Sequence, residues 1–444
     1  MASRPHILIV GGGYVGLYTA LRLQKRLSRG EADITVVDPQ PHMTYQPFLP
    51  EAAAGSVEPR HVVVPLRRTL KHTRVITGSV TAISHATRTA TVRPAEGLDE
   101  QIRYDVLVLA PGSVARTLPI PGLAEHGIGF KTVGEAIYLR NHVLSRLDVA
   151  ASLTGGDAED EAKKRRALTF TFIGGGYAGI EALAELEDMA RYAIKRYYSA
   201  LRPEDMRWVL IEATGRILPE VGVDMGAWTV TQLVARGMDV RLNTRLESMT
   251  DFHVVLSDGE EFDSDTIVWT AGVKAHPMLR ETDLPLDDKG RLDCTAELRV
   301  RGVADAWSAG DCAAVPDLTS DVPGALCGPS AQHAVRQAKR LADNIAEVLR
   351  GGRPSPYAHK YAGSVASLGL YKGVAQIYGI KVKGFPAWFM HRTYHMSRVP
   401  TFNRKVRVLA DWTLAFFFRR EVTSLGQIQH PRAEFEQAAK LRPR

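Results

Sequence analysis

Short runs of apolar, often β-branched residues alternate along the chain with longer segments whose apolar positions recur at helical spacing. Residues 6–10 (HILIV) form the first run and predict a buried parallel strand. Apolar residues at helical spacing follow as far as Leu27, and a second run occupies residues 34–37. This strand–helix–strand order predicts an α/β fold built on parallel sheets.

The same order occurs again in the middle of the chain. Residues 168–173 (LTFTFI) predict another strand, apolar residues continue at helical spacing to Met189, and residues 208–211 (WVLI) predict the strand after it. A repeated strand–helix–strand unit predicts two Rossmann-type dinucleotide-binding domains in one chain.

A glycine pattern stands between strand and helix in the first unit. Gly11, Gly13 and Gly16 fill G-x-G-x-x-G, which allows a tight turn, the approach of a pyrophosphate, and close packing of helix on strand. Asp38 ends the second strand, 22 positions after Gly16, where a carboxylate can accept hydrogen bonds from a ribose. Together these features predict a dinucleotide site.

The second unit has the same pattern at Gly174, Gly176 and Gly179. Its acid, Glu212, lies 33 residues after Gly179, because residues 191–204 are expected to extend the helix and its loop. An acid here favours the free 2′-hydroxyl of NADH over the 2′-phosphate of NADPH. Arg216 stands close enough in sequence to accommodate a phosphate, which leaves NADPH as the alternative.

A third pattern indicates which of the two domains binds which dinucleotide. A short strand within residues 303–309 leads to Gly310 and Asp311, a pair that would place a carboxylate on the ribityl chain of FAD; the alternative is an ordinary turn. Strands leaving the two nucleotide domains end at Ala110–Gly112 and at Gly272. We therefore predict FAD in residues 1–115 and 276–355, NADH in residues 116–275, and a separate tail, residues 356–444.

Two further segments carry expectations. Residues 152–166 are polar and rich in turn formers, and predict a solvated, mobile loop. Pro329 and Ser330 predict the start of a helix with an apolar stripe that ends before Gly351. The positive end of that helix dipole would stabilise an anionic reduced flavin.

Charge and aromatic residues are concentrated in the tail. Of the 444 residues, 45% are hydrophobic, and the net charge is +7. Residues 356–444 hold 15 Lys and Arg against 4 acids, so the tail carries +11 and the rest −4. They also hold 14 of the 33 aromatic residues. Aromatic residues among cations are typical of a segment that lies on a membrane surface. A subunit interface and a nucleic-acid surface are the alternatives, nucleic acid being the least favoured.

The cysteines and histidines exclude other kinds of site. Three cysteines without paired spacing exclude a disulfide framework, residues 39–60 lack the cysteine pair of disulfide reductases, and Cys312 is expected to be a small buried residue. No group of residues has metal-ligand spacing, so no metal site is predicted; His391 and His395 are expected on a solvated or interfacial face. No signal peptide is recognised, which favours a cytoplasmic compartment.

Several motifs together resemble the type II NADH:quinone oxidoreductases, within the glutathione-reductase type of flavoprotein. The similarity extends from Ile7 to about Arg420. Beside the two glycine triplets, its marks are Tyr45-Gln46-Pro47, Gly179-Ile180-Glu181, Arg216-Ile217-Leu218-Pro219, Gly310-Asp311-Cys312-Ala313, the segment AQHAVRQ at residues 331–337, and Asn403-Arg404 with VLADW at residues 408–412.

The resemblance implies an enzyme that passes a hydride from NADH to FAD and two electrons to a membrane quinone, menaquinone or ubiquinone, without pumping protons. Gln332 and Gln337 match the family's quinone-site motif, and Glu181 is a candidate proton donor, with Glu185 a weaker one. The alternative roles are exposed helix residues for the glutamines and compensation of helix charge for Glu181. The resemblance further implies a homodimer and a peripheral protein on the cytoplasmic side of the cell membrane.

The sequence departs from the family at two places. Ala110-Pro111-Gly112 replaces Ala-Thr-Gly, and residues 369–396 match only loosely, which leaves the shape of the quinone entrance open. Two other functions stay open as well. One is a soluble NADH-dependent reductase of a ferredoxin-like carrier, and the other is a flavin redox sensor with slow turnover.

Overall fold

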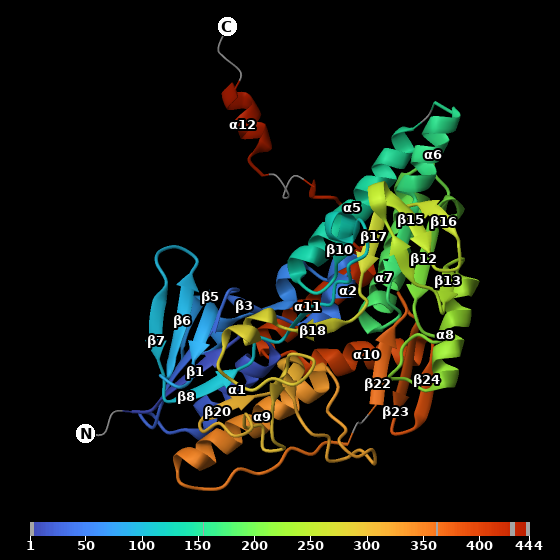
Figure 1. Cartoon of the computed structure of the whole chain (residues 1–444). Helices are drawn as coiled ribbons and strands as arrows, with labels where there is room; N and C mark the ends of the chain where they lie inside the picture. Colours follow the sequence, from blue (N-terminus) through green and yellow to red (C-terminus); the bar gives the residue numbers. More distant parts are fainter. Residues whose placement is uncertain (1–3, 154, 361–362, 427–430, 441–444) are drawn as a thin grey trace. The chain divides into compact units, whose positions relative to one another are not determined.

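A computed structural model describes residues 4–153, 155–360, 363–426 and 431–440 of the chain (Figure 1). These residues form two compact units. The first unit consists of Met1–Thr44, Val63–Arg116 and Val273–Tyr361, and the second of Tyr45–Val62, Thr117–Gly272 and Ala362–Arg444. Both are α/β, as predicted, and each is described by itself. The assignment of FAD and NADH to particular segments stays a prediction.

A seven-stranded sheet forms the centre of the first unit, in the order β20-β8-β1-β2-β5-β6-β7. Its strands are β1 (His6–Val10), β2 (Asp33–Asp38), β5 (Arg74–Ser84), β6 (Thr89–Pro94), β7 (Glu100–Arg103), β8 (Val106–Leu109) and β20 (Ala306–Ser308). The pairs from β20 to β5 are parallel, whereas β5, β6 and β7 pair antiparallel. The predicted strand at residues 6–10 is confirmed, and its apolar run is buried because parallel strands are covered on both faces.

Two helices of this unit pack together, α1 (Tyr14–Arg26) and α9 (Ala331–Leu349). Arg22 forms an ion pair with Asp343 at 2.9 Å, and the Thr19 hydroxyl donates to the Ala338 carbonyl at 3.3 Å. The Ser330 side chain caps α9 by accepting from the backbone N–H of His333. The predicted start of this helix is therefore confirmed.

Short elements complete the first unit. They are β3 (His42–Thr44) with β4 (Val63–Pro65), α3 (Leu66–Thr69), β9 (Ser113–Ala115) with β18 (Val273–Ala275), the 3-10 helices η5 (Pro277–Glu281) and η6 (Gly310–Cys312), and β19 (Leu292–Asp293) with β21 (Ala313–Ala314). The turn η6 follows β20 directly and precedes α9 in the chain, so it stands where the Gly310-Asp311 pair was predicted.

The second unit contains a five-stranded parallel sheet in the order β10-β17-β11-β12-β13. Its strands are β10 (Gly127–Gly129), β11 (Thr169–Ile173), β12 (Arg207–Glu212), β13 (Asp239–Leu242) and β17 (Thr266–Trp269). Its main helices are α5 (Val133–Ser152), α7 (Tyr177–Tyr197) and α8 (Val223–Ala235). The length of α7 confirms that the chain beyond Arg191 extends this helix before β12 begins.

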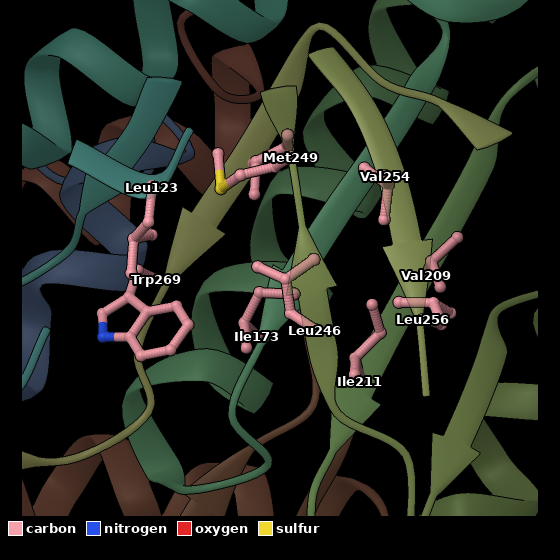
Figure 2. Close-up of a cluster of buried hydrophobic side chains, with 10 residues drawn as sticks. Leu123, Ile173, Val209, Ile211, Leu246, Met249, Val254, Leu256 and Trp269 are labelled. Atoms are coloured by element: carbon pink, nitrogen blue, oxygen red, sulfur yellow. The ribbon is translucent and has the colours of Figure 1, made fainter. Parts of the chain in front are cut away.

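A second, antiparallel sheet of this unit is formed by β14 (Leu246–Ser248), β15 (His253–Leu256) and β16 (Glu261–Asp263). Figure 2 shows the apolar cluster to which it contributes, where Leu246, Val254 and Leu256 lie with Ile211 of β12 and Trp269 of β17. Ile173 of β11 belongs to the same cluster, so the two strands that carry the second nucleotide motif, β11 and β12, both contribute to this buried core.

The expected loop at residues 152–166 is wrong, because a helix, α6 (Ala158–Ala167), occupies most of it. The Asp157 side chain caps α6 by accepting from the Asp160 backbone N–H. Acids fill its first turn, bases fill its last, and Lys163 pairs with Glu159 at 2.6 Å. This arrangement suits the helix dipole, so a segment with almost no apolar face is still helical.

The C-terminal part of the second unit has a three-stranded antiparallel sheet, β22 (Gly363–Ser367), β23 (Gly373–Ile377) and β24 (Ile380–Lys383), followed by helices α10 (Phe385–Arg398), α11 (Phe402–Phe418) and α12 (Ala433–Lys440). The short helices η1 (Gln46–Phe48), α2 (Leu49–Ala53), η2 (Pro59–His61), α4 (Leu123–His126), η3 (Pro203–Asp205) and η4 (Thr250–Phe252) also belong to this unit. Among the described helices, none has the length and apolar character required to span a bilayer. Residues 361–362, 427–430 and 441–444 of the predicted tail lie outside the described residues.

Candidate functional site

The first glycine turn connects β1 to α1, and the fold itself requires two of its three glycines. Gly11 has φ +101°, and a Cβ there would lie 2.2 Å from the Ala110 carbonyl oxygen. A Cβ on Gly16 would lie 1.8 Å from the Gly11 carbonyl oxygen. These two positions therefore exclude any side chain, and they place Ala110 directly against the turn.

Gly13 is different, because neither its backbone nor its neighbours require glycine. It has φ −71°, and a Cβ there would meet no described atom within 4 Å. In the G-x-G-x-x-G pattern this glycine leaves room for the backbone to approach a pyrophosphate. The open space at Gly13 therefore fits a dinucleotide.

Asp38 stands at the end of β2 beside this turn. Its carboxylate accepts from the Gly12 backbone N–H at 2.6 Å and from the Gln40 backbone N–H at 2.7 Å. Burial raises the pKa of Asp38, against the lowering effect of those two N–H groups. Each carboxylate oxygen can accept a second hydrogen bond, so the side chain can hold the turn and a ribose hydroxyl at once.

The Gly310-Asp311 turn lies in the same unit and is tied to both of its neighbours. The Gly310 backbone N–H donates to the side-chain oxygen of Gln337 at 2.8 Å, and the Ser113 hydroxyl donates to Asp311 at 2.6 Å. A Cβ on Gly112, just before Ser113, would meet no atom within 4 Å. The bond from Ser113 places Gly112, its neighbour in the chain, beside the Gly310-Asp311 turn, a contact that the motif alone does not show.

Gln332 and Gln337 lie on the first turns of α9 in different environments. Gln337 is 1% exposed and holds the Gly310 turn, whereas Gln332 is half-buried. Sequence reasoning placed both at a quinone and missed the contact between Gln337 and Gly310. The signal that could have revealed it is the position of Gln337 beside Ala338, on the buried side of the predicted helix.

All three cysteines are free and buried. The expectation that Cys312 is a small buried residue is confirmed, and burial raises the pKa of its thiol to about 11. Burial also raises the pKa of Cys327 to about 11 and that of Cys294 strongly. Thiols that stay protonated are poor nucleophiles, so these residues do not provide the thiolate that disulfide chemistry needs.

The second glycine turn, between β11 and α7, repeats the geometry of the first. A Cβ on Gly179 would lie 2.1 Å from the Gly174 carbonyl oxygen, and Gly174 has φ +110°. A Cβ on Gly176 or on Gly272 would meet no atom within 4 Å. The second unit therefore has its own open backbone surface, which fits a second dinucleotide.

Glu212 ends β12 as predicted and accepts three hydrogen bonds. The backbone N–H groups of Gly175 and Thr214 donate to it at 2.6 and 2.8 Å, and the Thr214 hydroxyl donates at 2.8 Å. Arg216, the residue that left NADPH open, donates its guanidinium to the Pro219 carbonyl oxygen. Its side chain is thus engaged by the backbone of its own loop, while the carboxylate stands at the turn.

Glu181 is buried on α7 and contacts the C-terminal part of the unit. It accepts from the Ser367 backbone N–H at 2.8 Å, and its carboxylate lies 3.0 Å from Nε2 of His391. Burial by itself lowers the pKa of His391, but the Glu181 carboxylate outweighs it, so that pKa is raised. The expected solvated face for His391 is wrong: α10 turns this residue into the interior, toward an acid that sequence spacing could not pair with it.

His395 is half-buried, which does not contradict the expected interfacial face, and its ring packs against the ring of His391. Burial, and then the neighbouring His391, hold the pKa of His395 well below the usual value for histidine. The Tyr45 hydroxyl donates to the His395 carbonyl oxygen at 3.0 Å. The two histidines thus differ in charge preference although they lie one turn apart.

Two more buried carboxylates face the same helices. Glu51 of α2 pairs with Arg392 at 3.0 Å and accepts from the Trp412 indole N–H at 2.6 Å. Glu185 of α7 lies 3.5 Å from the Arg420 guanidinium, and burial raises the pKa of this carboxyl against the lowering effect of Arg420. These pairs attach α10, α11 and the segment after them to the rest of the second unit.

A pocket of about 790 Å³ lies between these elements, entirely within the second unit. Its deeper members include Arg392 and Arg420, and its exposed members include Phe385, Phe389 and Phe416. The volume is in the range of small-molecule sites. Gln46, one of the residues that carry the family resemblance, is exposed and donates to the Lys131 carbonyl oxygen at 3.3 Å.

Comparison with protein families matches residues 5–338 to the pyridine nucleotide-disulphide oxidoreductases. The chain belongs to this family. A Mycobacterium tuberculosis protein named type II NADH:quinone oxidoreductase Ndh is 28% identical over 99% of this chain and 94% of its own length. A Synechocystis protein named demethylphylloquinone reductase NdbB is 30% identical over 92% of this chain and 96% of its own length.

Solved structures agree with this membership at the level of the fold. The NDH2 of Plasmodium falciparum in complex with NADH has a TM-score of 0.86 at 16% identity, over 95% of this chain and all of that one. Within the pyridine nucleotide-disulphide oxidoreductases, the chain is a member of the type II NADH:quinone oxidoreductases, and the resemblance drawn from its motifs is confirmed.

Proposed function

We propose that this chain oxidises NADH and reduces a membrane quinone, with FAD as its resident cofactor and without pumping protons. The observation that carries the proposal is the pair of glycine turns, each with an acid at the end of its second strand and an open position at its middle glycine. Two dinucleotide sites in one chain suit an enzyme that passes electrons from a nicotinamide to a flavin.

The first unit supplies the residues that would hold FAD. The turn at Gly11, Gly13 and Gly16 would accept the pyrophosphate and Asp38 the ribose, while Asp311 would take the ribityl chain. When bound, FAD accepts a hydride from the nicotinamide and gives two electrons to the quinone. We accordingly propose an FAD domain formed by residues 1–115 and 276–355. The NADH domain would be residues 116–275, and the membrane-associating region residues 356–444.

The second unit supplies the residues for NADH. Glu212 would accept from the free 2′-hydroxyl of the adenosine ribose, and its charge would repel a 2′-phosphate. Arg216, bonded to the Pro219 carbonyl oxygen, is less available to a phosphate than the sequence suggested. Both features favour NADH over NADPH.

Gln332 and Glu181 are the residues that we assign to the quinone. An amide on the first turn of α9 can donate to a quinone oxygen, and a buried acid paired with a histidine can hold and release a proton. For Gln337 we propose a positioning role at the Gly310 turn, because its side-chain oxygen is already bonded there.

The C-terminal helices are proposed to lie on the cytoplasmic face of the membrane. Phe416, Phe417 and Phe418 end α11 with exposed side chains, and Arg419 follows them with its side chain exposed too. Exposed rings beside a cation suit the headgroup region of a bilayer. Trp388 and Trp412 do not belong to this surface, because both pack against Arg392. We also propose that the protein is a homodimer, which only its resemblance to the family supports.

Steady-state oxidation of NADH by the purified holoprotein tests the proposal. Menaquinone and ubiquinone analogues are compared as acceptors with a ferredoxin-like carrier protein. Fast oxidation that requires the quinone is expected. Transfer to the carrier without quinone turnover would support the carrier-reductase alternative, and slow turnover with every acceptor would support the redox sensor.

A further inference from the structure

A second pocket, of about 360 Å³, lies in the first unit, and none of the residues of the glycine turns or of the Gly310-Asp311 turn is among its lining residues. One face is the middle of α9, and the other parts come from α1 and the segment after α9. Its lining residues are Arg22, Arg336, Lys339, Arg340, Asp343, Tyr357, Ala358 and His359.

The lining carries an excess of positive charge. Its one carboxylate, Asp343, lies 2.9 Å from Arg22 and also 2.9 Å from Arg26, so it is already shared by two cations. Among the residues that the structure describes, no carboxylate stands within 4 Å of the guanidinium of Arg336 or of Arg340. Arg336 and Arg340 therefore bring two cationic groups to the pocket that have no ion-pair partner among the described residues.

The charge of Arg336 helps to lower the pKa values of two histidines, His359 of the lining and His333, whose ring lies next to that of His359. Burial, and after it the charge of Arg336, lowers the pKa of His359, and His333 adds to the effect. The pKa of His333 is lowered by burial and by Arg336 as well, against the raising effect of Asp317. In the described structure, Nε2 of His359 is buried and has no hydrogen-bond partner. A buried polar atom without a partner suits a ligand at this position.

The arrangement of the cations has a cost for the helix. Arg336 and Arg340 lie at i and i+4 on α9, where like charges repel each other and destabilise a helix. An anion in the pocket would turn this repulsion into attraction. The Arg336 guanidinium donates one N–H, from Nη1, to the Gln332 carbonyl oxygen at 3.1 Å, and its remaining N–H groups, together with those of Arg340, match phosphate oxygens.

We propose that this pocket binds a phosphate group, carried by inorganic phosphate, by a small phosphomonoester or by a lipid headgroup. Arg336 and Arg340 would hold the phosphate oxygens, and His359 would donate from Nε2. The volume is at the lower end of the range for ligand sites, which favours a compact anion over a whole dinucleotide.

Calorimetric titration of the FAD-loaded protein with inorganic phosphate tests the proposal, with chloride adjusted to keep the ionic strength constant. Saturable binding is expected for the wild type. Arg340→Glu should weaken it at least about tenfold, the loss expected when a charged hydrogen bond is replaced by repulsion. Lys25→Glu is the matched control, since Lys25 is exposed on α1 and does not line the pocket. It should change the affinity less than about twofold.

Retained FAD and an unchanged unfolding transition establish that Arg340→Glu is folded, and Arg340→Gln gives a second variant without the added acid. Vesicles of phosphatidylglycerol provide the other arm, in a background in which Phe416, Phe417 and Phe418 of α11 are replaced by Ser so that α11 does not itself bind them. Binding of inorganic phosphate assigns a free anion. Vesicle binding that Arg340→Glu abolishes, without binding of inorganic phosphate, assigns a lipid headgroup. Equal loss in Arg340→Glu and Lys25→Glu, or no saturable binding in either arm, overturns the proposal.

Discussion

The side-chain oxygen of Gln337 accepts a hydrogen bond from the Gly310 backbone N–H at 2.8 Å. This contact joins α9 to the turn proposed to carry the flavin's ribityl chain. It is the basis for the positioning role proposed for Gln337, a residue that the motif alone assigned to the quinone.

Gln337→Leu should therefore weaken FAD binding and leave the KM for quinone nearly unchanged. Loss of the acceptor leaves the Gly310 N–H unsatisfied in a partly buried turn, which costs about 1–3 kcal/mol, or roughly a tenfold to hundredfold loss of FAD affinity. The measurement is the FAD dissociation constant, followed by quinone kinetics at saturating FAD.

Gln332→Leu is the matched control, since Gln332 lies on the same helix with its side chain half-buried. It should raise the KM for quinone and retain FAD. If instead Gln337→Leu retains FAD and raises the quinone KM, then Gln337 contacts the quinone and the positioning role is wrong.

The glycines of the first turn should separate folding from cofactor binding. Gly16→Ala would press a Cβ to within 1.8 Å of the Gly11 carbonyl oxygen, so it should destabilise the protein with or without FAD. Gly13→Ala meets no such neighbour and should cost the apoprotein about 1 kcal/mol or less, as expected for alanine at a helix N-cap, while reducing FAD binding. Thermal unfolding of the apoprotein and FAD titration measure the two effects. Full FAD affinity in Gly13→Ala would contradict the proposed pyrophosphate site.

The pair of Glu181 and His391 should make stability depend on pH in a defined direction. The pKa of His391 is raised in the folded protein, so its contribution is fully present below its unfolded value, about 6.5, and is lost as the pH rises through the folded value. His391→Gln should cost about 3 kcal/mol of unfolding free energy near pH 6, because it leaves a buried acid without its partner.

That cost should shrink as the pH rises through the raised pKa of His391, because the wild-type imidazole then loses its proton. Urea unfolding at about pH 6 and about pH 9 measures the difference. His72→Gln is the control, since His72 is exposed, and it should show the same small effect at both pH values. A cost for His391→Gln that does not fall with rising pH would show that the pair is not charged in the folded protein.

The strands and glycine turns could be predicted because each is encoded locally. Residues 6–10 form a strand from their own apolar run, and Gly11 and Gly174 mark turns that almost no other residue adopts. The start of α9 follows from a capping serine next to it in sequence. These features need no knowledge of distant partners.

The predictions that were wrong depended on what local composition does not contain. Helix α6 is stabilised by the order of its charges, whereas the prediction weighed only their polarity. His391 is buried because Glu181, far away in the chain, offers it a charge partner. Trp388 and Trp412 are among the tail aromatic residues whose composition predicted a membrane surface, yet both pack against Arg392, a buried arginine that pairs with Glu51. The burial of His391, Trp388 and Trp412 therefore depends on partners far away in the chain, whereas α6 depends on the order of its own charges.

The end of α11 should be needed for membrane binding. Phe416, Phe417 and Phe418 are 68–78% exposed, and burying even part of three phenylalanine rings in a bilayer is worth several kcal/mol, at about 1.5–3 kcal/mol each when complete. Replacing all three by Ser should weaken binding to anionic vesicles at least about tenfold, as measured by co-sedimentation.

The matched control replaces Leu98, Leu318 and Val322 by Ser, since these are exposed apolar residues of the first unit. It should leave vesicle binding unchanged. Point substitutions are preferable to removal of the chain after about residue 400, because that truncation would also remove Trp412 and Arg420 from the buried carboxylates Glu51 and Glu185. Equal loss of binding in both triple variants would show that α11 is not the membrane contact.

The most direct test of the central claim is the rate at which a quinone reoxidises the flavin. Holoprotein is reduced with one equivalent of NADH without oxygen, then mixed rapidly with a menaquinone or ubiquinone analogue while flavin absorbance is followed. The proposed function predicts reoxidation at least as fast as steady-state turnover, with one quinol formed per NADH consumed. A flavin that NADH reduces but that no quinone reoxidises would contradict the account.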